Sequence, residues 1–288
     1  MNKKIAFLLD TGSSYKLHES DCFIVPIVIN VKEENEEKSY YDEETITRQE
    51  LVHFLEQKRK VSTSKPVLGM IMDKLDELLE TYDMVISIPL SKGLSSTYDT
   101  WLTLQKEYGE HRLLVADANT MSVSGNWLVQ ELKQHLATVD QFDQDDLDEL
   151  TDSIKQRTCG AVIVTDLSQL IAGGRLKGIK GLLARVLKLN LIIQYKGVLD
   201  FKDKDKSLES AIKKTLDIID SENHFRTKGI KRISIFADLK DPKANETYTK
   251  LAQELINTDV PYSEGLLPGC VIMHTGVDTF SILIEANA

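Results

Sequence analysis

A cluster of Ser and Thr side chains lies between an apolar segment, residues 84–88, and the start of a segment with helical spacing at residues 101–108. The cluster includes Ser91, Ser95, Ser96 and Thr97. This order predicts a buried strand, a turn and a helix. Because the first turn of a helix has unpaired N–H groups and a partial positive charge, the junction is suited to binding an anion.

A simpler role also fits these residues. The only role of Ser95 or Ser96 could be to cap the following helix, where the side chain accepts a hydrogen bond from one of the unpaired N–H groups. Ligand binding and capping therefore both stay open at this junction.

Two further polar groups repeat the pattern. Asp10 and Ser13 follow the apolar run 5–9, and Thr63 and Ser64 precede Pro66, which can start a helix. Each of these residues can contact a ligand, or can bond to local backbone as a turn or cap residue does.

A fourth polar turn, residues 117–120, follows the apolar run 113–116. Strands that alternate with helices form parallel sheets, and the carboxyl ends of parallel strands meet at one edge. Polar turns follow three of the predicted strands, at residues 10–13, 91–97 and 117–120, and together they predict a binding crevice at that edge.

Composition limits the class of protein. The chain has 288 residues, 42% of them hydrophobic and 28% charged, which is typical of a soluble globular protein large enough for two domains. The net charge is −10 with dispersed Lys and Arg, so nucleic acid is not an expected partner.

The cysteines and the apolar segments indicate a compartment. Cys22, Cys159 and Cys270 are far apart and odd in number, which predicts free thiols and neither a disulfide framework nor a metal site. No apolar run reaches the roughly 20 residues that a membrane helix needs, and the first is too short for a signal peptide. We expect a cytoplasmic protein without stable membrane insertion.

The predicted elements divide the chain into two domains. Residues 1–157 alternate strands and helices, which predicts an N-terminal α/β domain with a mainly parallel, Rossmann-like sheet flanked by helices. Residues 158–288 predict a C-terminal α+β domain. Residues 23–31 read as one strand interrupted by Pro26, and residues 182–187 as helical.

Five motifs in order resemble the DegV family over nearly the whole chain. They are Asp10-Thr11-Gly12-Ser13, Thr63-Ser64-Lys65-Pro66, Leu94-Ser95-Ser96-Thr97-Tyr98, Gly173-Gly174-Arg175 and His274-Thr275-Gly276. The resemblance implies a DegV-type fold that holds one long-chain fatty acid in a tunnel near the domain interface. It implies no catalysis and no cofactor.

The same resemblance implies a role as the acyl-binding subunit of a bacterial fatty acid kinase in phospholipid metabolism. Such a carrier presents the carboxylate to an ATP-using partner. Thr63, Ser64 and Ser95 match family hydroxyls that bond the carboxylate, and His274 and Arg175 match residues of the head-group end and the Gly-Gly-Arg turn.

Two departures from the family pattern bear on the site. Ser96 replaces a glycine, and Asp278 follows His274 where the family has a Gly-Pro-Gly continuation. A carboxylate close to His274 would favour the protonated imidazole. Residues 200–206 alternate Asp and Lys, where the family often has a basic stretch that is thought to meet the kinase.

Two other classes of function stay open. An acyl hydrolase would use Ser95 as nucleophile and His274 as base, with Asp10 or Asp278 to orient it, although the Gly-x-Ser-x-Gly elbow is absent. An interaction protein could keep the fold and have lost the lipid.

Overall fold

The computed structural model describes residues 3–32, 36–177 and 189–288. The chain divides into two compact units. Unit 1 comprises residues 1–154 and 268–271, and unit 2 comprises residues 155–267 and 272–288. The sequence placed one boundary after Arg157, but it gave no sign that residues 268–271 rejoin the first unit.

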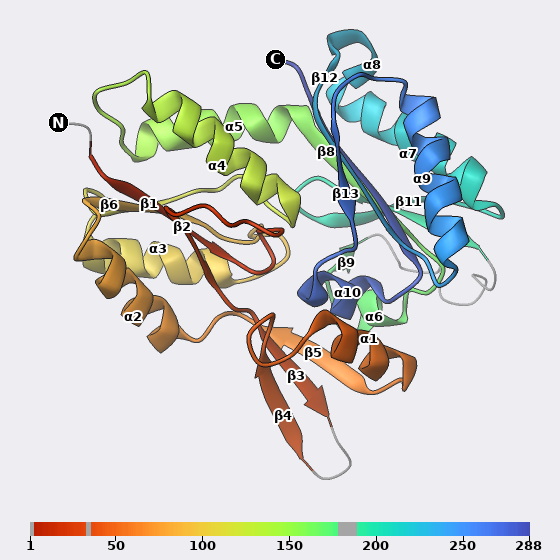
Figure 1. The fold of residues 1–288 in the computed structure, drawn as a ribbon, viewed down its shortest axis with the longest axis horizontal. Helices are drawn as coiled ribbons and strands as arrows, with labels where there is room; N and C mark the ends of the chain where they lie inside the picture. The colour runs from red at the N-terminus through yellow and green to blue at the C-terminus, as the bar shows by residue number, and fades with distance from the viewer. Residues whose placement is uncertain (1–2, 33–35, 178–188) are drawn as a thin grey trace. The chain divides into compact units, whose positions relative to one another are not determined.

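Sheet A of unit 1 is fully parallel, in the order β2-β1-β6-β7 (Figure 1). Its strands are β1 (Ile5–Asp10), β2 (Cys22–Val25), β6 (Met84–Ile88) and β7 (Leu113–Val115). The helices around it are α2 (Leu68–Leu79), α3 (Thr97–Tyr108), α4 (Val123–Leu136) and α5 (Gln144–Arg157). This arrangement confirms the predicted α/β fold.

The alternation of side chains along β1 explains the two layers of helices. Phe7 and Leu9 pack in a cluster with apolar residues of α4 and α5, while Ala6 and Leu8 pack in a second cluster with α2 and α3. Neighbouring side chains on a strand point to opposite faces, so an unbroken apolar run is buried on both.

Unit 1 also contains a small antiparallel sheet, sheet B, in the order β4-β3-β5. Its elements are β3 (Val28–Lys32), β4 (Glu37–Tyr41), β5 (Lys60–Ser64) and the helix α1 (Arg48–Glu56). The single strand expected over residues 23–31 was wrong, because the chain leaves sheet A at Pro26 and enters sheet B two residues later. Proline has no N–H for a sheet ladder.

Unit 2 has a seven-stranded mixed sheet in the order β13-β12-β14-β8-β10-β11-β9. The strands are β8 (Thr158–Val164), β9 (Leu176–Lys177), β10 (Asn190–Tyr195), β11 (Leu199–Asp205), β12 (Ile230–Asp238), β13 (Tyr262–Gly265) and β14 (Thr279–Ala286). The helices are α6 (Ser168–Ala172), α7 (Leu208–Asn223), α8 (Phe225–Lys228) and α9 (Pro242–Ile256). The helix α10 (Gly269–Thr275) begins in the segment assigned to unit 1 and ends in unit 2. The α+β prediction is confirmed.

The core of unit 2 lies between its sheet and the helices α7 and α9. Ile212 and Ile219 of α7 and Ala252 of α9 are buried in one cluster with Ile233 and Ile282 of the central strands. The helix expected over residues 182–187 lies outside the described residues. No helix in the described part of the chain combines the length and apolarity needed to cross a membrane.

Candidate functional site

Three loops meet at the carboxyl edge of sheet A and are bonded to one another. They follow β1, β6 and β7. The Ser13 hydroxyl donates to the Ile88 carbonyl at 2.6 Å, and the Leu90 N–H donates to Asp10 Oδ2 at 2.8 Å. The Ser91 N–H donates to the Thr120 carbonyl at 2.9 Å. The convergence that the sequence predicted at this edge is therefore present.

Asp10 holds this edge together. Its side chain is fully buried, and Oδ1 accepts the N–H groups of Gly12 and Ser13, each at 2.9 Å. Burial raises its pKa to about 6, although the backbone N–H bonds, led by that of Leu90, act in the opposite direction. These bonds give Asp10 and Ser13 a local structural role, and ligand contact by either stays a prediction.

Ser95 and Thr97 form a hydroxyl pair at the start of α3. Their hydroxyl oxygens are 2.8 Å apart, and Ser95 Oγ accepts the Thr97 N–H at 3.2 Å. Ser96 occupies the N-cap position, but its side chain makes no capping bond. The half-buried Ser95 therefore accepts a first-turn N–H, and its pair with Thr97 leaves a donor at a helix N-terminus.

Thr63 and Ser64 lie on β5 and do not cap α2, so that expectation was wrong. The N-cap position of α2 is Val67, which has no side-chain capping bond. Consecutive residues on a strand face opposite sides, so the two hydroxyls point apart. Ser64 Oγ accepts from Asn30 Nδ2 at 3.0 Å, whereas Thr63 is paired in register with the fully buried Ile29.

One contact connects this segment to the Ser95 turn. Lys65 follows β5, and its Nζ lies 2.7 Å from Oγ1 of Thr100 in the first turns of α3. The two hydroxyl motifs, which are far apart in the sequence, therefore belong to one neighbourhood of unit 1.

Two motifs meet in unit 2. Gly173 ends α6, and a Cβ on it would lie 2.6 Å from Nδ1 of His274. Burial, together with the neighbouring Arg175 guanidinium, lowers the pKa of His274 to about 4. His274 is therefore neutral near pH 7 and can donate or accept a hydrogen bond. Arg175 donates to the Gly173 carbonyl, which closes the Gly-Gly-Arg turn.

Asp278 does not have the effect that its position in the sequence suggested. Its carboxylate accepts from the Thr165 hydroxyl at 3.3 Å and from the Lys240 N–H at 3.2 Å. The direction of the His274 pKa shift is also opposite to the one that a nearby carboxylate would produce. Both carboxylates of the hydrolase hypothesis, Asp10 and Asp278, therefore have other partners.

One group of metal-ligand types occurs in the described residues. Ligand atoms of Glu19, Asp21 and Cys22 lie within 4.8 Å of one another. Lys133 Nζ lies 2.5 Å from Glu19 Oε2 and from Asp21 Oδ1, so an ammonium already compensates the two carboxylates. Burial raises the pKa of Cys22 to about 12, which disfavours a thiolate ligand. This lysine-centred cluster was not foreseen from the sequence.

A cavity of about 260 Å³ opens near the beginning of β1 and β6, away from the hydroxyl loops. Apolar residues that line it include Phe7, Met84, Leu136 and Phe142. No local pattern of residues indicates this cavity, because its lining comes from segments that are far apart in the chain.

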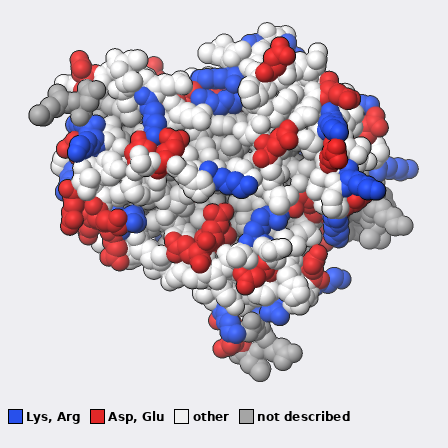
Figure 2. Space-filling view, viewed as in Figure 1, with Lys and Arg blue, Asp and Glu red and all other residues white. Residues whose placement is uncertain are grey.

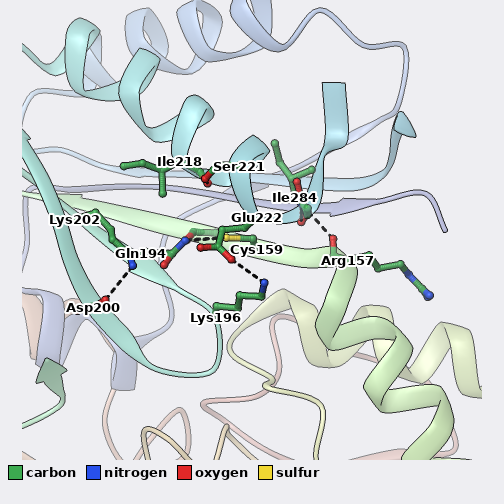
Figure 3. A network of polar contacts seen from close by, with 12 residues as sticks. Arg157, Cys159, Gln194, Lys196, Asp200, Lys202, Ile218, Ser221, Glu222 and Ile284 are labelled. Carbon is green, nitrogen blue, oxygen red and sulfur yellow. Dashed lines mark hydrogen bonds and ion pairs between the residues drawn. The ribbon is translucent and has the colours of Figure 1, made fainter. Parts of the chain in front are cut away.

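The strand β11 carries the alternating charges of residues 200–206. Lys202 pairs with Asp200 at 3.0 Å, and Lys214 of α7 pairs with Asp203 at 2.9 Å and with Asp205 at 3.1 Å. Figure 3 shows the Lys202–Asp200 pair on one side of Gln194 and the buried Cys159, whose sulfur accepts from Gln194, on the other. Basic and acidic side chains are also interspersed on the face in Figure 2. Lys202 and Lys214 are therefore each paired with a nearby carboxylate.

Comparison with known proteins agrees with the fold. The family model described as "Uncharacterised protein, DegV family" matches residues 4–287. A DegV domain-containing protein of Ureaplasma parvum is 40% identical over 218 residues, covering 76% of this chain and all of the relative. Another, from Mycoplasma genitalium, is 28% identical and covers 99% of this chain and all of the relative.

Solved structures show the same fold. A fatty acid binding DegV family protein from Streptococcus agalactiae superposes with a TM-score of 0.81 at 21% identity, over 99% of this chain and all of that one. DegV from Bacillus subtilis, described as a fatty acid binding protein, gives 0.79 at 19% identity with the same coverage. The family match over nearly the whole chain, with the closely similar Ureaplasma relative, shows that this protein belongs to the DegV family.

Proposed function

We propose that this protein binds one long-chain fatty acid and that hydroxyl groups at the carboxyl edge of sheet A bond its carboxylate. The observation that carries the proposal is the Ser95–Thr97 hydroxyl pair at the start of α3. A carboxylate is stabilised by such donors and by the positive end of the helix. Structures of DegV proteins described as fatty acid binding support the ligand class.

The tail would supply most of the affinity. Each buried methylene contributes roughly 0.8 kcal/mol, which can exceed the cost of ordering a long chain. The hydroxyls would fix the direction in which the ligand enters, because a carboxylate removed from water needs donors.

The proposed ligand residues fall into two groups, one in each unit. Unit 1 contributes Thr63, Ser64 and the hydroxyls near Ser95, and unit 2 contributes His274 with Arg175. A neutral His274 can bond a carboxylate without adding a buried charge. Variants of each group can be tested separately.

The test is native mass spectrometry of the purified protein with extraction and identification of bound lipid. We expect one fatty acid per chain, with tenfold or greater loss of affinity in Ser95→Ala. Thr63→Val should weaken binding more than Ser64→Ala, since Thr63 is half-buried on the sheet face that carries the buried Ile29, whereas Ser64 is exposed on the other face. Ser62→Ala, on the exposed part of the same strand, is the matched control.

Failure of the wild-type protein to retain or take up any fatty acid would overturn the proposal. The hydrolase alternative would then be tested by ester hydrolysis before and after Ser95→Ala.

We also propose that the bound acid is presented to a separate fatty acid kinase subunit, which makes the protein a non-catalytic carrier. With ATP and such a kinase, acyl phosphate should form only when this protein is present, and hydroxylamine trapping would detect it. The pairing of Lys202 with Asp200 predicts that docking will not depend on Lys202. A Lys202→Ala variant that abolishes product while it still binds fatty acid would contradict that expectation.

A further inference from the structure

Ser122 begins α4 with an unusual backbone. Its φ is 54° and its ψ is −132°, in a region that residues with a Cβ rarely adopt. This conformation lets the Ser122 N–H donate to the Gly12 carbonyl at 2.7 Å. It also brings Gly125 against the Ser13 carbonyl, where a methyl group would overlap the oxygen. The backbone is therefore explained by the docking of α4 onto the loop after β1.

The side chain of Ser122 is not explained in this way. The side chain makes no capping bond, and Ser122 is only 4% exposed. Its hydroxyl oxygen has no hydrogen-bond partner in the described part of the chain. Glycine would adopt the same backbone with less strain. The hydroxyl thus costs stability within the chain, and a partner outside the chain would account for it.

The turn that carries Ser122 belongs to the candidate site. Thr120 accepts the Ser91 N–H at 2.9 Å and donates through its hydroxyl to the Pro89 carbonyl. Lys92 pairs with Asp117 at 2.6 Å. The loop that leads to Ser95 is therefore bonded directly to the turn that leads to Ser122. The helix that follows has 14 residues, so the dipoles of several turns add up to a partial positive charge at its N-terminus.

We infer that the Ser122 hydroxyl and the first turn of α4 form a second oxyanion subsite, which takes a carboxylate or a phosphate group. The oxyanion gives the hydroxyl the acceptor that it lacks. In this structure the oxygen exposes less than 1 Å², so the inference requires the turn at 117–121 to move when an anion binds. If the group is the carboxylate of a fatty acid, this inference rests on the proposed function. If the group is a phosphate, it does not.

The sequence carried part of this signal. The polar turn 117–120 after a predicted strand was recognised, but Ser122 was not, because neither its positive φ nor the burial of its hydroxyl follows from residue types.

Calorimetric titration of hexadecanoate and of inorganic phosphate tests the subsite. The variants are Ser122→Ala, which removes the hydroxyl, and Ser122→Gly, which also relieves the backbone. Both should weaken binding of at least one probe about tenfold, while Ser122→Gly raises the melting temperature. The control is Ser221→Ala in α7 of unit 2, whose exposed hydroxyl donates to the Ile218 carbonyl at 2.7 Å and should leave both affinities unchanged.

The inference is overturned if the wild-type protein binds neither probe, or if both Ser122 variants bind both probes within about twofold of wild type. It is also overturned if Ser221→Ala weakens binding as much as Ser122→Ala, because the loss would then not depend on where the hydroxyl lies. If hexadecanoate fails to bind wild type but phosphate binds through Ser122, the proposed function fails and the subsite stands.

Discussion

The ring of His274 packs against the backbone of Gly173, so closely that a Cβ at position 173 would lie 2.6 Å from Nδ1. These residues belong to two motifs that are about a hundred positions apart in the sequence. The glycine is needed for this approach and not for its backbone angles, because its φ is −73°.

We predict that Gly173→Ala displaces the imidazole of His274. The cost should be about 1–3 kcal/mol, as is typical of an extra methyl group in a packed site. An NMR titration of His274 should show its pKa moving toward the ordinary value. The control is Gly174→Ala, where φ is 67° and a Cβ meets nothing within 4 Å, so strain should appear without a change at His274. An unchanged His274 titration in Gly173→Ala would refute the contact.

His274 should make stability fall in acid. Its pKa is about 4 in the folded protein and about 6.5 in an unfolded chain. Between these values the unfolded state binds more protons, so stability is lost as pH falls from about 6.5 to 4, by at most about 3 kcal/mol. Urea unfolding of wild type and His274→Gln across this range measures the difference. Parallel curves for the two proteins would contradict the prediction.

Asp10 should act in the opposite direction. Its folded pKa of about 6 lies above the unfolded value near 3.9, so the folded state holds its proton more strongly. Stability is then lost as pH rises from about 4 to 6, by up to about 3 kcal/mol. The two slopes partly cancel in wild type, and the comparison of wild type with Asp10→Asn isolates this one. An unchanged difference between wild type and the variant over this range would show that Asp10 ionises at its ordinary pKa and would contradict the prediction, as would a gain of wild-type stability.

Gly125→Ala should disrupt the docking of α4. The added methyl group would overlap the Ser13 carbonyl oxygen, and backbone atoms on both sides limit relaxation. We expect a loss of about 3 kcal/mol or failure to fold. Gly69→Ala is the control, since a Cβ there meets nothing within 4 Å in α2 and should stabilise by up to about 1 kcal/mol. Equal effects of both substitutions on the unfolding midpoint would contradict this reading.

Glu285 should be essential to the core of unit 2. Its side chain is 1% exposed and lies 2.9 Å from Arg157 Nε and 2.7 Å from Arg232 Nη1. Glu285→Gln removes the buried carboxylate that both arginines contact and should cost about 3–5 kcal/mol. The matched control is Glu209→Gln, which removes an exposed pair with Lys213 and should cost less than about 0.5 kcal/mol. Chemical denaturation measures both, and similar losses would contradict the prediction.

Much of the fold followed from local pattern. The apolar runs at 5–9 and 84–88 predicted buried strands because both faces of such a strand are covered, and β1 and β6 confirm them. The hydroxyls before α3 could be placed at a helix start because a segment with helical spacing follows them. The single strand expected over residues 23–31 failed because a proline can also mark a change of sheet.

By itself, the sequence determined the order of strands and helices, the family, and the position of hydroxyls at strand ends, because these depend on neighbours in the chain. Only the tertiary structure decided that Ser64 bonds Asn30, that Asp278 bonds Thr165, and that His274 rests on Gly173. It also decided that Ser122 is buried without a partner among the described residues. These outcomes depend on contacts between distant segments, and such contacts set burial, side-chain direction and pKa in ways that residue types alone do not specify.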